Sequence, residues 1–306
     1  MTKNRMFDEN YWTAGIQQGD QRLVAKAITL VENDEEVAQQ ILQHLPLRTV
    51  PVIGITGPPG AGKSTLVDAL IQEWNSRQKK IAVICIDPSS PFHHGALLGD
   101  RIRMNRWYDH PSVFIRSLAS RGALGGLHPK IIEITDVLKA APFDLILLET
   151  VGVGQSEIEI AGLADVTAVV LVPESGDEIQ TLKAGLYEIA SLFIVNKSDR
   201  PGAELFTKNL IASLASWGRP GSERVPVLQT IALQHQGISE VIRAIEKVWN
   251  EKNNLDEKAW VLAQKAYYLI QEKRMKDISK TQLKEKIRVQ LEKGPLNLYA
   301  FCQNFS

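Results

Sequence analysis

The sequence predicts an α/β fold whose centre is a doubly wound, mostly parallel β-sheet, with helices added before and after it. Short apolar runs, each long enough for one buried strand, alternate along the chain with segments whose apolar residues recur at helical spacing. One junction between a predicted strand and a predicted helix also carries a glycine-rich stretch. In doubly wound sheets the ligand lies at the carboxyl ends of the strands, so the residues after each strand form the candidate site.

Helices are predicted ahead of the first strand, over about Tyr11 to Leu47. Gly19-Asp20 supplies a start signal within this segment, and Pro46 ends it. We expect residues 1–47 to be an N-terminal helical extension that packs against the core. Its two apolar faces consist of Leu23, Val24, Ala27, Ile28 and Val31, and of Val37, Ile41, Leu42 and Leu45.

The sheet is predicted within residues 48–250. Five parallel-type strands alternate with helices, at 50–56, 81–86, 143–149, 166–172 and 192–195, and a last strand at 225–232 precedes a helix at 237–249.

Charged helices are predicted in the remaining segment, residues 251–306, at 259–276 and 280–292. So short a tail cannot cover all of its own apolar positions. Docking onto the same subunit and formation of a dimerisation arm both remain open on this ground.

The glycine-rich stretch at residues 57–64 fits G-x-x-x-x-G-K-[ST], with a predicted strand before it and a predicted helix after it. Glycines let successive N–H groups point inward, and the helix N-terminus adds the positive end of its dipole. Lys63 is expected to reach the β- and γ-phosphates, and the Ser64 hydroxyl to ligate Mg²⁺. The sequence therefore predicts that a nucleoside triphosphate binds to Gly57, Pro58, Pro59, Gly60, Ala61, Gly62, Lys63, Ser64 and Thr65.

Carboxylates follow or end two of the predicted strands, Asp87 after 81–86 and Glu149 at the end of 143–149. An acid at such a strand end lies beside the ligand crevice. In a P-loop enzyme it holds Mg²⁺ through water, and the N–H of Gly152 can contact the γ-phosphate. The residues after Gly152 are expected to move with nucleotide state.

The residues Asn-Lys-Ser-Asp at 196–199 indicate which base is bound. The Asp199 carboxylate can accept hydrogen bonds from guanine N1–H and N2–H₂, which adenine does not offer. A paired contact of this kind discriminates by about 1–3 kcal/mol. We expect the Lys197 stem to lie along the ring, Asn196 to brace the loop and the Ala232 N–H to meet guanine O6. GTP is therefore expected rather than ATP.

Composition argues against several other classes of protein. Lysine plus arginine and aspartate plus glutamate each number 35, so no net charge favours nucleic acid or an anionic membrane as a partner. No apolar run approaches the roughly 20 residues that span a bilayer, and the N-terminus lacks the apolar core of a signal peptide. We expect a cytoplasmic protein. Adjacent histidines at His93-His94 are typical of a solvated loop.

Longer stretches of the chain resemble the MeaB/ArgK family of methylmalonyl-CoA mutase-associated GTPases. The most specific is Glu-Thr-Val-Gly-Val-Gly-Gln-Ser-Glu at 149–157. The others lie at 27–33, 54–65, 87–90, 98–101 and 120–127.

The resemblance implies a homodimeric GTPase that acts as chaperone of a cobalamin-dependent acyl-CoA mutase, in adenosylcobalamin loading, protection and reactivation. It implies that Asp87, Asp100 and Glu149 serve the magnesium and γ-phosphate site beside Ser64. Lys183 would belong to a segment that responds to the partner. The family's C-terminal helices form a dimer arm, which favours that reading of residues 251–306.

The chain departs from the family pattern at three places. His94-Gly95 replaces a glycine pair, Glu174-Ser175 replaces Gly-Ala, and Ile231 replaces the usual serine before Ala232. Two other functions stay open as alternatives. An amino-acid transport-linked ATPase or kinase would have to use ATP, and a nickel-insertion GTPase would need a cluster of cysteines and histidines.

Overall fold

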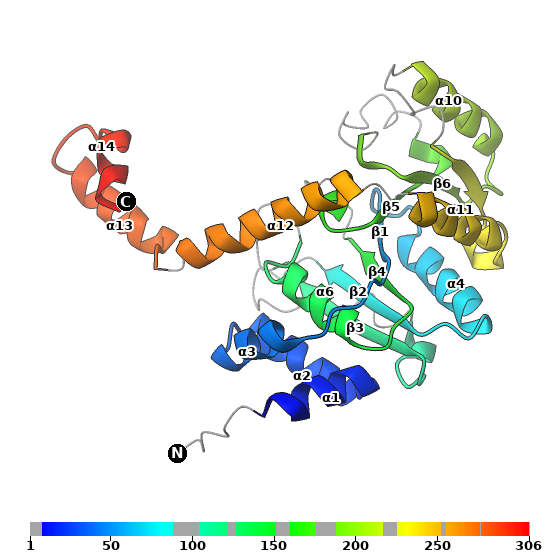
Figure 1. The fold of residues 1–306 in the computed structure, drawn as a ribbon. Helices are drawn as coiled ribbons and strands as arrows, with labels where there is room; N and C mark the ends of the chain where they lie inside the picture. The colour runs from blue at the N-terminus through cyan, green and yellow to red at the C-terminus, as the bar shows by residue number, and fades with distance from the viewer. Residues whose placement is uncertain are drawn as a thin grey trace. The chain divides into compact units, whose positions relative to one another are not determined.

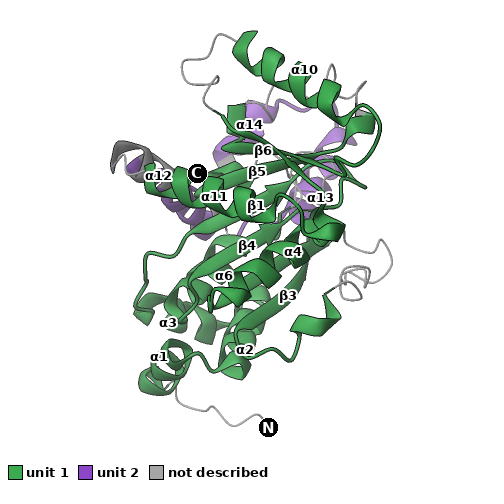
Figure 2. Ribbon diagram, turned by 90° about the vertical axis from the view of Figure 1, so that its right-hand side faces the viewer, with its two compact units in different colours: residues 1–254 green, residues 255–306 purple. Residues whose placement is uncertain are grey.

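The computed structural model describes residues 8–87, 104–120, 127–150, 160–175, 188–216, 225–251, 255–275 and 277–305. The chain divides into two compact units, residues 1–254 and residues 255–306, which Figure 2 colours green and purple. In chain order, the elements of the first unit are α1 (Glu9–Gln18), α2 (Gln21–Glu32), α3 (Glu36–His44), β1 (Val52–Thr56), α4 (Lys63–Ser76), β2 (Ile81–Asp87), η1 (Asn105–Trp107), β3 (Val113–Ala119), α6 (Ile131–Ala140), β4 (Leu145–Glu149), η2 (Ile160–Gly162), β5 (Val166–Leu171), η3 (Pro173–Ser175), β6 (Leu192–Asn196), α10 (Ala203–Ser216), β7 (Val227–Thr230), η5 (Ala232–Gln234) and α11 (Ile238–Glu251).

A seven-stranded sheet forms the centre of the first unit (Figure 1), in the order β3-β2-β4-β1-β5-β6-β7. Every strand pair among the described residues is parallel. The inner strands β1, β2, β4, β5 and β6 are buried along their whole length, as expected for parallel strands covered by helices on both faces. The predicted fold class is confirmed.

One strand was not predicted. β3 pairs with β2 from Val113 beside Ile81 to Ala119 beside Asp87, at the edge of the sheet. Its middle residues are only half-buried and include Arg116, whose guanidinium forms an ion pair with Glu32 of α2. An edge strand with a charged residue at its centre lacks the continuous apolar run that identifies the other strands, so periodicity alone did not detect it.

Helices cover both faces of the sheet. Alternate strand residues such as Ile53 and Ile55 belong to a core cluster with α4 and α11. Val52 and its counterparts on neighbouring strands belong to a second cluster with α1, α2, α3 and α6 on the opposite face, and α10 covers Phe193 and Val195 (Figure 1). The double winding therefore leaves one edge of the sheet, at the carboxyl ends of the strands, for the candidate site.

The N-terminal helices pack on this core. Asp20 caps α2 by accepting hydrogen bonds from the backbone N–H groups of Arg22 and Leu23. The apolar face predicted for this helix is buried completely, against α1, α3 and α6. Its residues are Leu23, Val24, Ala27, Ile28 and Val31.

The second unit consists of α12 (Leu255–Arg274), α13 (Lys280–Leu291), α14 (Leu298–Cys302) and η6 (Gln303–Phe305). The rings of Phe301 and Phe305 lie 5.2 Å apart, and the Lys286 ammonium lies 4.8 Å from the centre of the Phe305 ring. The helices predicted at 259–276 and 280–292 correspond to α12 and α13. Among the described residues, no helix combines the length and the apolar character needed to cross a membrane.

Candidate nucleotide-binding site

The described site residues come together at the carboxyl ends of the strands. The glycine-rich loop follows β1, Asp87 ends β2, Glu149 ends β4 and Asn196 ends β6. Ala232 follows β7 after one residue. These strands are parallel, so their carboxyl ends share one edge of the sheet. Three predicted site residues lie outside the part of the chain that the structure describes: Asp100, Gly152 and Lys183.

Two glycines of the loop are required by space as well as by conformation. Gly57 has φ 135°, and a Cβ there would lie 2.1 Å from the backbone oxygen of Val170. Gly62 has φ 86° and caps α4, and a Cβ there would lie 2.5 Å from Asn196 Nδ2. Gly60 has φ 77° with open space around it. At Gly57 the loop thus approaches the backbone of β5 more closely than a side chain allows, whereas at Gly62 it meets the side chain of Asn196.

The side chain of Lys63 is folded into the loop. Its Nζ donates hydrogen bonds to the carbonyl oxygens of Gly57 at 2.8 Å and Pro58 at 3.1 Å, and the residue is buried. A positive charge is therefore fixed at the start of α4, where the helix dipole also favours an anion. This arrangement suits the phosphates of a nucleotide.

Ser64 and Glu149 form the next part of the site. The Ser64 hydroxyl donates to Glu149 Oε1 at 2.6 Å, and both residues are buried. Cys85 lies beside Glu149 in the sheet register and contacts its other carboxylate oxygen, with Sγ 4.0 Å from Oε2. Asp87, also buried, ends the same strand as Cys85.

This oxygen-rich cluster fits Mg²⁺. The Ser64 hydroxyl points toward the Glu149 carboxylate, and hydroxyl and carboxylate oxygens are ligands that suit Mg²⁺. No group of three or more His, Cys, Asp or Glu residues within the described ranges could hold a metal ion alone. That is the usual situation for Mg²⁺, which retains waters and substrate phosphates as ligands.

Two threonines that sequence reasoning missed fix the chain beside this cluster. Thr150 Oγ1 donates to Thr56 Oγ1 at 2.9 Å, and Thr150 N donates to the Ile55 carbonyl at 3.1 Å. Both threonines are buried. The available signal was that each directly ends or follows an apolar strand, as Glu149 does.

Asn196 connects three segments of the site. Its Nδ2 donates to the Ala61 carbonyl of the glycine-rich loop at 2.9 Å. Its Oδ1 accepts from Thr230 Oγ1 and from the Ala232 N–H, each at 3.1 Å. The side chain therefore braces the loops after β1, β6 and β7 against one another. Thr230, a further residue that the sequence did not single out, pairs with Asn196 in the sheet register.

Lys197 and Asp199 lie at the surface end of this brace. Lys197 has φ 56°, and its Nζ donates to the Gly60 carbonyl at 2.7 Å, so its stem extends toward the glycine-rich loop. The Ser198 N–H donates to the Thr230 carbonyl at 3.0 Å. Asp199 is exposed, so an incoming base can reach its carboxylate.

The backbone N–H of Ala232, predicted to meet guanine O6, donates to Asn196 Oδ1 in this structure. A contact with a base would share or replace this bond, so that role stays a prediction. The loop itself is held by two backbone hydrogen bonds between Ile231 and Gln236, at 3.1 and 3.3 Å. Ile231, which stands where the resembled family usually has a serine, makes both of these hydrogen bonds with its backbone.

Glu174, one of the residues at which the chain departs from the family pattern, forms an ion pair in the structure. Arg200, directly after Asp199, forms an ion pair with Glu174 of η3, the short helix that follows β5. The hydrogen bond from Arg200 lowers the pKa of the Glu174 carboxyl below its ordinary value. The two residues are about half exposed, so the pair contributes little to stability, yet it links the chain after β5 to the loop after β6.

The chain is also similar in sequence to a known family and to several known proteins. The sequence profile of the family described as "Methylmalonyl Co-A mutase-associated GTPase MeaB" matches residues 24–287. A protein from Pyrococcus abyssi is 50% identical over 232 residues, which cover 74% of this chain and 71% of that protein. The "Fused isobutyryl-CoA mutase" of Cupriavidus metallidurans is 42% identical over 195 residues, 62% of this chain and 18% of that protein.

A solved structure shares the fold. The structure titled "Crystal structure of LAO/AO transport system kinase" superposes with a TM-score of 0.68 at 22% sequence identity, over 100% of this chain and 98% of that one. At this level of identity the likeness concerns the architecture alone.

Proposed function

This chain belongs to the MeaB family of methylmalonyl-CoA mutase-associated GTPases, and on that premise we propose that it binds and hydrolyses GTP in support of a cobalamin-dependent acyl-CoA mutase. The observation that best supports the proposal is the Asn196 brace. It joins the glycine-rich loop, which suits phosphates, to the loops that carry Asp199 and Ala232, which suit guanine. One side chain thus links the two halves of the proposed guanine-nucleotide site.

Hydrolysis in such a site depends on position and charge rather than on a protein nucleophile. Lys63 would stabilise the negative charge of the phosphates from inside the loop. Ser64 would hold Mg²⁺, with Glu149 keeping its hydroxyl oriented. We assign Asp87, and Asp100 and Gly152 outside the described residues, to the same magnesium and γ-phosphate site. Bound Mg²⁺ would neutralise charge on the β- and γ-phosphate oxygens.

The partner is proposed from the family and from the fused relative. A chain region similar to this one stands in a single polypeptide named as an isobutyryl-CoA mutase, which supports an acyl-CoA mutase as partner. The proposed role is that of a chaperone in adenosylcobalamin loading, protection and reactivation. We further propose that the protein is a cytoplasmic homodimer, with residues 251–306 as the dimerisation arm and Lys183 in a segment that responds to the mutase.

The two alternative functions have less support. The solved structure named as a transport system kinase is too distant in sequence to carry its activity over. The described residues contain no cluster of metal-binding side chains for nickel, and His93 and His94 lie outside them.

The deciding experiment measures phosphate release from GTP by the isolated protein, with and without a purified cobalamin-dependent acyl-CoA mutase, and with ATP in parallel. We expect slow hydrolysis of GTP that rises when the mutase is added, and no comparable hydrolysis of ATP. Equal turnover of ATP would contradict the guanine assignment. A rate of GTP hydrolysis that is the same with and without the mutase would contradict the proposed partner.

A further inference from the structure

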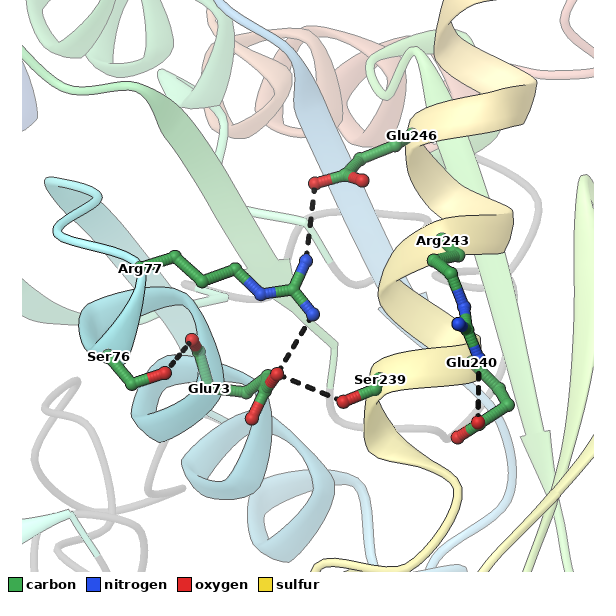
Figure 3. Close-up of polar contacts among 7 residues, drawn as sticks. All are labelled: Glu73, Ser76, Arg77, Ser239, Glu240, Arg243 and Glu246. Carbon is green, nitrogen blue, oxygen red and sulfur yellow. Dashed lines mark hydrogen bonds and ion pairs between the residues drawn. The ribbon is translucent and has the colours of Figure 1, made fainter.

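Two helices on the same face of the sheet are joined by a polar contact (Figure 3). Glu73 of α4 accepts hydrogen bonds at one carboxylate oxygen from Arg77 Nη2 at 2.8 Å and from the Ser239 hydroxyl of α11 at 2.9 Å. Arg77 also lies 3.8 Å from Glu246 of α11. The contact between Glu73 and Ser239 therefore crosses from one helix to the other.

Each of these helices belongs to a different half of the candidate site. α4 begins with Lys63 and Ser64, the residues proposed to bind the phosphates and Mg²⁺. α11 begins at Ile238, directly after the loop that carries Ala232. Ser239 lies in the first turn of α11, so the contact with Glu73 is made at the end of that helix nearest the base loop.

The chain between Ala232 and Ser239 is held tightly. Gly237 has φ 77°, and a Cβ there would lie 2.2 Å from the carbonyl oxygen of Gln229 in β7. With the Ile231–Gln236 hydrogen bonds, this close approach leaves the loop little freedom to move independently of the first turn of α11. A shift at Ser239 is thus expected to move the backbone N–H of Ala232.

We propose that Glu73, through Ser239, is a positioning residue that fixes the guanine half of the site relative to the phosphate half. The inference rests on the proposed function, since it requires a ligand that occupies both halves. It predicts that the contact strengthens binding of a whole guanine nucleotide and has no effect on a ligand that occupies the phosphate half alone.

A matched control lies on the same helix. Arg243 donates to Glu240 at 2.7 Å within α11, and this exposed pair does not reach α4 (Figure 3). Glu240→Ala removes a glutamate and an ion pair from α11, as Glu73→Ala does from α4, and leaves the contact between the helices intact.

The test is calorimetric titration of GDP into the wild-type protein, Glu73→Ala, Ser239→Ala, the double variant and Glu240→Ala. Melting temperatures are recorded for each variant to verify folding. We expect Ser239→Ala to bind GDP about 3- to 10-fold more weakly, the effect of one hydrogen bond, and Glu73→Ala, which also loses the hydrogen bond from Arg77, to bind GDP at least as weakly. The double variant should bind GDP no more weakly than the single variant with the lower affinity, because the two residues share one contact. Glu240→Ala should bind like the wild type.

A second measurement separates positioning from general loosening of the fold. The inhibition constant of tripolyphosphate in competition with GDP should be unchanged in Glu73→Ala. An equal weakening of tripolyphosphate and GDP, or wild-type affinity for GDP in Glu73→Ala, would overturn the inference alone. A wild-type protein that fails to bind GDP would instead remove the proposed function, and this inference with it.

Discussion

The hydroxyl of Ser64 donates a 2.6 Å hydrogen bond to the carboxylate of Glu149. It joins the first turn of α4 to the end of β4, the strand that lies beside β1 in the sheet. The Glu149 carboxylate thus orients the serine hydroxyl and places a negative charge beside the serine oxygen.

Replacing Glu149 with glutamine should therefore raise the requirement for Mg²⁺. Loss of an outer partner of a metal ligand commonly costs about 10- to 100-fold in metal affinity or activity. The measurement is the rate of GTP hydrolysis as a function of Mg²⁺ concentration. Glu204→Gln, an exposed substitution on α10, serves as the control. An unchanged Mg²⁺ dependence in Glu149→Gln would show that the carboxylate does not support the cation site.

Alanine at Gly57 and at Gly60 should have unequal effects on stability. Both glycines have positive φ, which costs an alanine about 1–2 kcal/mol. Only at Gly57 would the added Cβ also meet a backbone oxygen at 2.1 Å, whereas Gly60 has open space. Chemical denaturation should show a loss near that range for Gly60→Ala and a larger loss, or failure to fold, for Gly57→Ala. Equal losses would contradict the close approach to Val170.

Asp199→Asn should change the base that is preferred. Xanthine carries a carbonyl oxygen where guanine carries its 2-amino group, and asparagine can donate a hydrogen bond that aspartate cannot. Affinity for GDP should fall and affinity for XDP should rise, by about 10-fold or more each. Competition binding with both nucleotides measures the ratio. A uniform loss for both would mean that Asp199 supports the loop but does not read the base.

The pH dependence of stability should reveal the ionised state of Glu73. The hydrogen bond from Arg77, followed by that from Ser239, lowers the pKa of this carboxyl from its ordinary value of 4.5. At pH values between the lowered pKa and 4.5, the unfolded chain binds more protons than the folded one. The free energy of unfolding therefore rises with pH across this window. The contribution of the charge is complete above the ordinary value and is lost as pH falls through the lowered pKa.

Glu73→Gln should therefore differ most from the wild type above pH 4.5 and least at pH values below the lowered pKa. Urea denaturation of both proteins across this range provides the comparison. A difference that is the same at every pH would mean that the charge of Glu73 does not contribute. The side chain of Glu73 is about one-third exposed, so high salt should reduce the effect.

Local sequence patterns correctly predicted the features that are determined within one segment of the chain. Residues 57–64 identified the glycine-rich loop by spacing alone, and the apolar face of α2 was correct at every predicted position. Strand β3 was missed because its sequence, with Arg116 at its centre, reflects an edge position that only the assembled sheet defines.

Contacts between distant segments were beyond such reasoning. Glu73 with Ser239 and Glu174 with Arg200 are ordinary charged or polar residues in sequence, and their partners lie 166 and 26 positions away. Which of many possible partners each side chain meets is decided by how the helices and loops pack on the sheet. Nothing in the neighbouring residues encodes that choice.

The central place of β1 has a consequence for the synthesis of the protein. Ile53 pairs with Leu147 on one side and with Val166 on the other, so this strand does not have both of its neighbours until more than half of the chain has been made. Pairing across such separations is slow to form, because long loops must close first. The glycine-rich loop is synthesised early, but the neighbouring strands that hold its conformation are synthesised later. A nascent chain that has just emerged through residue 100 should therefore bind no nucleotide, and nucleotide binding should appear only after β5 has left the ribosome.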